Sequence, residues 1–228
     1  MRLLLSTQNL SFGYKNNNEK ILKNINLNLY KGEILAILGL SGSGKTTLCH
    51  CLSGIIPHIY EGELKGEVQI KGKSILDLDL PKIAEYIGIV FQNPETQVFF
   101  PVVEDELAFG PENLCISREE IGKRIENILS LLGKENLRYK KTKHLSGGEK
   151  QLTVLASVLA LEPEILIFDE VMSQIDTKGK KLIKEIIILL KEKGKTIVMV
   201  EHDLENAEIA DRKLLLKNGR LKKFAGEL

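Results

Sequence analysis

The chain has 228 residues, of which 43% are hydrophobic and 28% charged, and its formal net charge is +1. This length can form one large domain or a core with a subdomain, and the composition is typical of a soluble globular protein. The small net charge and the scattered arginines argue against nucleic acid as a partner, since such a surface needs clustered basic residues.

Cysteine usage and hydropathy further restrict the class of protein. The three cysteines, Cys49, Cys51 and Cys115, are odd in number and lack the spacing of a zinc site, which favours a reducing compartment. No stretch approaches the roughly 18 apolar residues that a membrane span needs. If the protein serves a membrane, we expect another chain to supply the span.

The apolar pattern predicts one half-buried strand followed by four buried strands. Apolar residues at 25, 27 and 29 alternate with asparagines, and the asparagine-rich segment 15–19 predicts a loop. Continuous apolar runs typical of buried parallel strands lie at residues 33–38, 86–91, 164–168 and 196–200. Each run ends at polar residues, and the carboxyl ends of parallel strands are where open α/β sheets bind ligands.

The loop after the first buried run, GLSGSGKTT at residues 39–47, has the spacing of a phosphate-binding loop. Its glycines allow backbone N–H groups to surround a phosphate, Lys45 can reach the β- and γ-phosphates, and the Thr46 hydroxyl can ligate magnesium. A chance glycine-rich turn is the weaker alternative, because a predicted strand and a predicted helix flank the loop. The expected nucleotide-binding residues are Gly39, Ser41, Gly42, Ser43, Gly44, Lys45, Thr46 and Thr47.

Two adjacent acids, Asp169 and Glu170, follow the third buried run. Asp169 fits a second magnesium ligand at a strand end, and the Glu170 carboxylate can orient or deprotonate a water. A solvated acidic loop is the alternative. Next to a phosphate-binding loop, the two acids favour hydrolysis over simple binding.

Weaker signals come from Gln92 and His202, which follow the second and fourth buried runs, and from Tyr14. The Gln92 amide can contact both metal and water, so the expected metal ligands are Thr46, Gln92 and Asp169. The His202 imidazole can bond a phosphate oxygen, and the Tyr14 ring can stack on adenine. Taken alone, the first two are more often surface residues, and an ordinary strand-end tyrosine remains the alternative for Tyr14.

Residues 93–162 change to helical patterns, at 103–110, 117–133 and 149–161. A further helix is predicted from Thr177 to about Lys193, where Gly194 ends it. We interpret the chain as one α/β domain whose core, residues 1–92 and 163–228, carries a helical subdomain at 93–162.

The segment HLSGGEK begins the helix at 149–161 with a second anion-binding pattern. Ser146 and Glu149 form a capping box, which by itself merely starts a helix. Gly147 and Gly148, however, are poor helix formers unless a ligand such as phosphate approaches the backbone closely. Because residues 39–47 already surround their own nucleotide, we expect this second site to serve ATP held by another copy, in a head-to-tail dimer with twofold symmetry.

Together these residues resemble the ATP-binding subunits of ABC transporters. The resemblance implies a P-loop NTPase core with a mainly parallel sheet, an N-terminal antiparallel β part and an inserted helical subdomain. It also implies an ATPase that uses ATP and Mg²⁺, peripheral on the cytoplasmic side of the membrane, and paired with a second ABC ATPase chain, either identical or a paralogue. The family's motif positions fall on Tyr14, residues 39–46, Gln92, residues 145–149, Asp169, Glu170, residues 173–176 with Asp176, and His202.

A narrower likeness lies at residues 91–114, FQNPETQVFFPVVEDELAFGPENL, which resembles the energy-coupling factor and cobalt or nickel uptake branch. That likeness implies uptake of a vitamin or metal ion, with a transmembrane subunit docking near residues 93–113. The acids in that segment, beside its phenylalanines, suggest a groove for a basic amphipathic helix. The sequence departs from the family at Leu152, where arginine is usual, and at Val171 and Met172, which replace Pro-Thr. The alternative is a non-transport ABC ATPase of DNA repair or translation.

Overall fold

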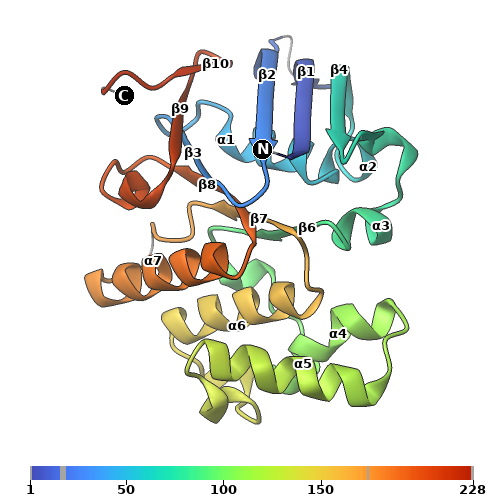
Figure 1. Cartoon of the computed structure of the whole chain (residues 1–228), viewed down its shortest axis with the longest axis vertical. Helices are drawn as coiled ribbons and strands as arrows, with labels where there is room; N and C mark the ends of the chain where they lie inside the picture. The colour runs from blue at the N-terminus through green and yellow to red at the C-terminus, as the bar shows by residue number, and fades with distance from the viewer. Residues whose placement is uncertain (1, 16–18, 174, 227–228) are drawn as a thin grey trace.

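The computed structural model describes residues 2–15, 19–173 and 175–226, whose strands form two sheets (Figure 1). The loop expected at 15–19 lies mostly outside the described residues, and so does Gln174 of the segment 173–176.

The N-terminal sheet is antiparallel and has the strand order β2-β1-β4-β5. Its strands are β1 (Leu3–Tyr14), β2 (Leu22–Tyr30), β4 (Gly62–Ile70) and β5 (Lys73–Ser74). The predicted alternation is present in β2, where Ile25, Leu27 and Leu29 are buried and Asn26 and Asn28 are exposed. The antiparallel β part is therefore confirmed.

The second sheet has six strands in the order β10-β9-β3-β8-β7-β6. They are β3 (Ile34–Leu38), β6 (Ile87–Val90), β7 (Ile165–Asp169), β8 (Thr196–Glu201), β9 (Arg212–Lys217) and β10 (Arg220–Lys223). All are parallel except β10, which pairs antiparallel with β9. The four apolar runs form β3, β6, β7 and β8, so the predicted parallel sheet is confirmed.

The strand β3 shows why these runs are apolar throughout. Ile34, Ala36 and Leu38 belong to the hydrophobic core on one face of the sheet, whereas Leu35 and Ile37 belong to the core on the other face. Because successive side chains point to opposite faces and both faces are covered, no position along β3 contacts water.

Helices cover both faces of the six-stranded sheet (Figure 1). The residues of α1 pack into one core together with the antiparallel sheet, and those of α4, α5, α6 and α7 pack into the other core. The helices are α1 (Lys45–Leu52), α2 (Ile55–His58), α3 (Leu80–Ala84), α4 (Val103–Asn113), α5 (Arg118–Leu131), α6 (Gly147–Ala160) and α7 (Thr177–Glu192). Short 3-10 helices lie at Ile75–Asp77, Pro94–Thr96, Glu135–Leu137, Thr142–His144 and Asn206–Ile209.

Between β6 and β7 the chain forms α4, α5 and α6, which pack on one another. In α5 the buried residues Ile121, Ile125 and Ile128 recur at helical spacing and face this cluster. Within the part of the chain that the structure describes, no helix is both long and apolar enough to cross a membrane.

Candidate active site

The loop at 39–47 joins β3 to α1 in a conformation that requires glycine. Gly42 and Gly44 have left-handed backbone angles, with φ of 79° and 99°. A Cβ atom on Gly39 would lie 2.6 Å from the carbonyl oxygen of Leu216. The buried Lys45 side chain folds back over the loop, where Nζ donates to the carbonyl oxygens of Gly39, at 2.9 Å, and Leu40, at 3.0 Å.

A cavity of about 630 Å³ opens beside this loop, a volume within the usual range for small-molecule sites. Three lysines, Lys20, Lys23 and Lys217, stand at its edge and give it positive charge. The other lining residues are Glu19, Ile21, Leu40, Ser41, Gly42, Ser43, Leu215, Leu216, Asn218 and Gly219. The residues Ser41, Gly42 and Ser43, predicted to bind phosphate, therefore face an accessible space.

Asp169, the last residue of β7, has the properties of a ligand for a divalent cation. It is buried, and among the described residues its Oδ1 atom has no hydrogen-bond partner. Burial raises the pKa of Asp169, and the neighbouring Thr46 hydroxyl lowers it. A cation in this position would favour the charged carboxylate, so Asp169 and Thr46 fit the magnesium ligands that the sequence predicts.

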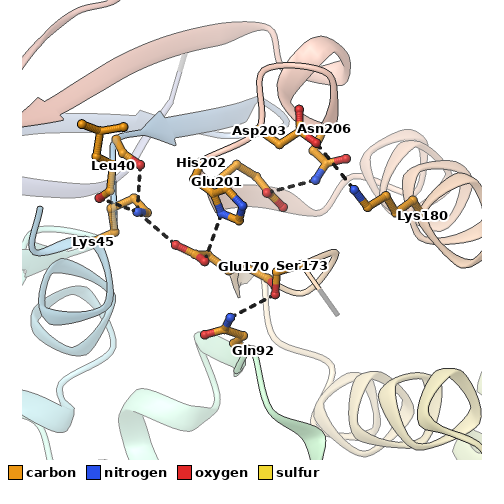
Figure 2. A network of polar contacts seen from close by, with 11 residues as sticks. Leu40, Lys45, Gln92, Glu170, Ser173, Lys180, Glu201, His202, Asp203 and Asn206 are labelled. Carbon is orange, nitrogen blue, oxygen red and sulfur yellow. Dashed lines mark hydrogen bonds and ion pairs between the residues drawn. The ribbon is translucent and has the colours of Figure 1, made fainter. Parts of the chain in front are cut away.

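Glu170 connects two other predicted site residues (Figure 2). Its Oε1 atom lies 3.0 Å from Nζ of Lys45, and its Oε2 atom lies 3.2 Å from Nδ1 of His202. The backbone of Glu170 is left-handed, with φ of 51°, and its N–H donates to the carbonyl oxygen of Val200. Non-glycine residues adopt this conformation rarely, and they do so preferentially at functional sites.

Gln92 follows β6 and reaches Glu170 through Ser173 (Figure 2). The Nε2 atom of Gln92 donates to Oγ of Ser173 at 3.1 Å, and that hydroxyl donates to the carbonyl oxygen of Glu170 at 2.8 Å. The structure thus gathers Lys45, Gln92, Glu170 and His202 at one edge of the sheet, although they come from four separate segments.

Tyr14 and Asp176 lie at element ends. Tyr14 ends β1 and packs edge-to-face against Phe12 with ring centroids 4.8 Å apart, and it is not among the residues that line the 630 Å³ cavity. The Asp176 side chain caps α7 by accepting from the backbone N–H of Gly179 at 2.8 Å.

The capping box at the start of α6 is present as the sequence predicts. Oγ of Ser146 accepts from the N–H of Glu149, and the Glu149 carboxylate accepts from the N–H of Ser146. A Cβ atom built on Gly147 or Gly148 would meet nothing within 4 Å. Packing among the described residues therefore does not explain why both positions are glycine.

The acids of the segment 93–113 are largely used within the chain, which revises our expectation of a free acidic groove. Glu95 pairs with Lys150, and Glu104 pairs with Arg138 at 2.7 Å. Glu106 is buried, and its carboxylate accepts hydrogen bonds from the backbone N–H groups of Phe99, at 2.8 Å, and Phe100, at 2.9 Å. Phe99 and Phe109 are exposed in the same segment, together with Asp105 and Glu112.

A sequence profile of the family described as ABC transporter matches residues 22–173, about two thirds of the chain. The chain belongs to the ABC transporter family. It is 42% identical over 219 residues to the energy-coupling factor transporter ATP-binding protein EcfA of Methanosarcina acetivorans, covering 96% of this chain and 78% of EcfA. A putative ABC transporter ATP-binding protein of Methanosarcina mazei is 41% identical over 220 residues, but the chain spans only 37% of its length.

Solved structures of this ABC family share the fold. CbiO1 from Clostridium perfringens, described as part of the ABC transporter complex CbiONQ, has a TM-score of 0.85 and 33% identity, covering 97% of this chain and 87% of CbiO1. The ATP-binding cassette MJ0796, a dimer in a post-hydrolysis state with ADP and Pi, has a TM-score of 0.83 and 29% identity. The match covers 98% of this chain and 100% of MJ0796. The predicted P-loop NTPase fold is confirmed, and the chain is an ABC ATPase domain.

Proposed function

We propose that this ABC ATPase domain hydrolyses ATP for an energy-coupling factor type transporter that takes up a vitamin or a metal ion. The observation that carries the proposal is the convergence of Lys45, Asp169, Glu170 and His202 at one edge of the parallel sheet. The similarity to EcfA and CbiO1 supports the uptake branch. The domain would work as a peripheral subunit on the cytoplasmic side of the membrane, with residues 93–162 as its helical subdomain.

Each residue of the site has a distinct proposed task. Thr46 and Asp169 would hold a magnesium ion, which would supply positive charge against the phosphates, and Gln92 on the neighbouring strand is a further candidate ligand. Lys45 binds the β- and γ-phosphates, Glu170 orients and deprotonates the attacking water, and His202 bonds a γ-phosphate oxygen. A γ-phosphate would compete with Glu170 for the Lys45 ammonium and so release the carboxylate for its role as base.

A second copy would complete each site. The open space in front of Gly147 and Gly148 allows a phosphate of another chain to approach the first turn of α6, where backbone N–H groups and the helix dipole favour an anion. Tyr14 would stack on the adenine, and Asp176 would lie at the interface between copies. MJ0796 is dimeric in two solved structures, which supports this arrangement.

The transmembrane partner is proposed to dock near residues 93–113. We expect exposed aromatic side chains to contribute more to this docking than charged ones. Phe99 is 75% exposed and Phe109 is 46% exposed, whereas Glu95 and Glu104 have partners within the chain. Exposed aromatic side chains are typical anchors of protein interfaces.

The test is co-expression with a candidate transmembrane subunit from the same genome, followed by pull-down in detergent. We expect Phe99→Ser to lose the membrane protein, whereas Tyr139→Ser, which changes an equally exposed aromatic outside residues 93–113, should retain it. ATP binding, measured in parallel, should be unchanged in both. Equal recovery of the membrane protein by wild type and Phe99→Ser would place the docking surface elsewhere.

A further inference from the structure

Glu201 is a buried acid directly before His202 that the proposed mechanism does not use. It ends β8 and is only 1% exposed. Its carbonyl oxygen accepts from the N–H of Gly39 at 3.3 Å, so its backbone also contacts the start of the phosphate-binding loop. Burying a carboxyl group costs free energy unless the group is hydrogen-bonded, so the contacts of Glu201 should explain why it is buried.

The side-chain partner of Glu201 is Asn206, which is also 1% exposed and begins the 3-10 helix Asn206–Ile209. Nδ2 of Asn206 donates to Oε2 of Glu201 at 3.2 Å (Figure 2). This bond joins the two ends of the loop 202–205, which carries His202. Both residues are buried, so the hydrogen bond that connects the two ends of the loop is shielded from solvent.

Contacts with α7 hold the same loop from outside. Asp203 lies 3.5 Å from Lys180, and Lys184 donates to the carbonyl oxygen of Glu205 at 2.8 Å. These contacts are partly exposed, so solvent weakens them. The buried bond between Glu201 and Asn206 is therefore the element that best fixes where His202 stands relative to Glu170.

Because the proposed function gives His202 and Glu170 their roles, the following step rests on it. We propose that Glu201 is a positioning residue, whose carboxyl holds Asn206 and thereby presents His202 to Glu170.

The protonation of Glu201 agrees with this role. Burial raises its pKa to about 7, the Asn206 hydrogen bond lowers it, and the negative charges of Glu170 and Asp203 raise it, against a lowering by Lys180. A neutral carboxyl has both a donor and an acceptor. The bond that the structure shows, from Nδ2 of Asn206 to Oε2 of Glu201, needs only an acceptor, so both the neutral and the charged carboxyl can form it.

Two measurements on the purified chain test the proposal. Hydrogen–deuterium exchange read by mass spectrometry should show faster exchange of the 202–206 backbone in Glu201→Leu, with exchange of residues 39–47 unchanged. ATPase assays should show kcat lowered by roughly 10- to 100-fold at little change in KM, since a misplaced catalytic contact costs rates of this order. Asn206→Ala removes the same bond from the other side and should reproduce both effects if Glu201→Leu fails to fold.

Glu201→Gln should rescue both measurements, because its amide oxygen can accept the same bond from Nδ2 of Asn206. A Glu201→Gln protein that behaves like Glu201→Leu would overturn the positioning role.

Thr196→Val is the matched control, since Thr196 is an equally buried polar residue at the other end of β8 and bonds Gly32. It should lower stability without changing exchange at 202–206. If Thr196→Val loosens that loop as much as Glu201→Leu does, or if Glu201→Leu leaves it unchanged, the positioning role is wrong. Absence of hydrolysis by wild type would contradict the proposed function, and the exchange comparison would still decide the role of Glu201.

Discussion

The Lys45 ammonium and the Glu170 carboxylate form a largely enclosed ion pair, with Nζ 3.0 Å from Oε1. The second carboxylate oxygen of Glu170 faces His202. One acid therefore connects the phosphate-binding loop to the loop after β8, and substitutions at these positions should have different effects.

Glu170→Gln should bind nucleotide with an affinity close to that of wild type but lose at least about 100-fold in turnover, because the amide cannot take a proton from water. Lys45→Ala should instead weaken binding, because its ammonium meets phosphates already in the ground state. Titration with a fluorescent ATP analogue and a phosphate-release assay separate the two effects. Wild-type hydrolysis by purified Glu170→Gln would exclude Glu170 as the base.

Gly148→Ala should separate folding from function. The added methyl group meets nothing within 4 Å, and alanine favours helix by up to about 1 kcal/mol over glycine. We therefore expect stability in urea to be unchanged or raised. ATP-dependent dimerisation, followed by light scattering in a Glu170→Gln background, should fall because the methyl group occupies the space for the phosphate. A Gly148→Ala protein that dimerises normally would argue against a second anion site.

Mixing two inactive variants tests the composite site. In a mixed dimer of Lys45→Ala and Ser146→Arg chains, one site combines the intact phosphate loop of one copy with the intact α6 start of the other. If a single site suffices, an equal mixture should recover roughly a quarter of wild-type hydrolysis, because half the dimers are mixed and each has one good site. Each variant alone is the control. No recovery, in a mixture shown by light scattering to dimerise, would mean that both sites must be intact.

Acid should remove the contribution of the ion pair at the start of α6. Lys140, together with the Ser146 backbone N–H, lowers the pKa of Glu149 to about 2. This pKa lies below the unfolded value, so the stabilisation is complete above about pH 4.5 and is lost as the pH falls towards 2. The pair is partly exposed, so solvent screening limits Lys140→Met to a cost of about 1 kcal/mol or less at pH 7. Urea unfolding should show the same difference at pH 7 and pH 5 and a smaller one at about pH 3. A difference that stays constant down to about pH 3 would exclude the pair as its cause.

The sequence alone determined the features that depend on local sterics and on hydrophobic periodicity. The spacing of Gly39, Gly44, Lys45 and Thr46 identified the phosphate loop, because left-handed angles and close backbone approach admit only glycine there. Continuous apolar runs identified four parallel strands, since both faces of that sheet are covered. The capping box at Ser146 followed from side-chain to backbone bonds over three residues.

Only the tertiary structure decided which distant groups meet. The sequence suggests an acidic groove at 93–113, yet Glu95 and Glu104 form ion pairs with Lys150 and Arg138 from segments far along the chain. The pairing of Lys45 with Glu170 likewise depends on β3 and β7 ending at the same edge of the sheet.

Glu201 likewise gives no sign of its burial in sequence, because a charged residue at a strand end is usually exposed. Its burial arises because β8 lies between β3 and β7 and Asn206 folds back over its end. Local sequence patterns predict the backbone conformation and which face of an element is buried. The partner of a polar side chain depends instead on how whole elements pack, and no short stretch of sequence encodes that packing.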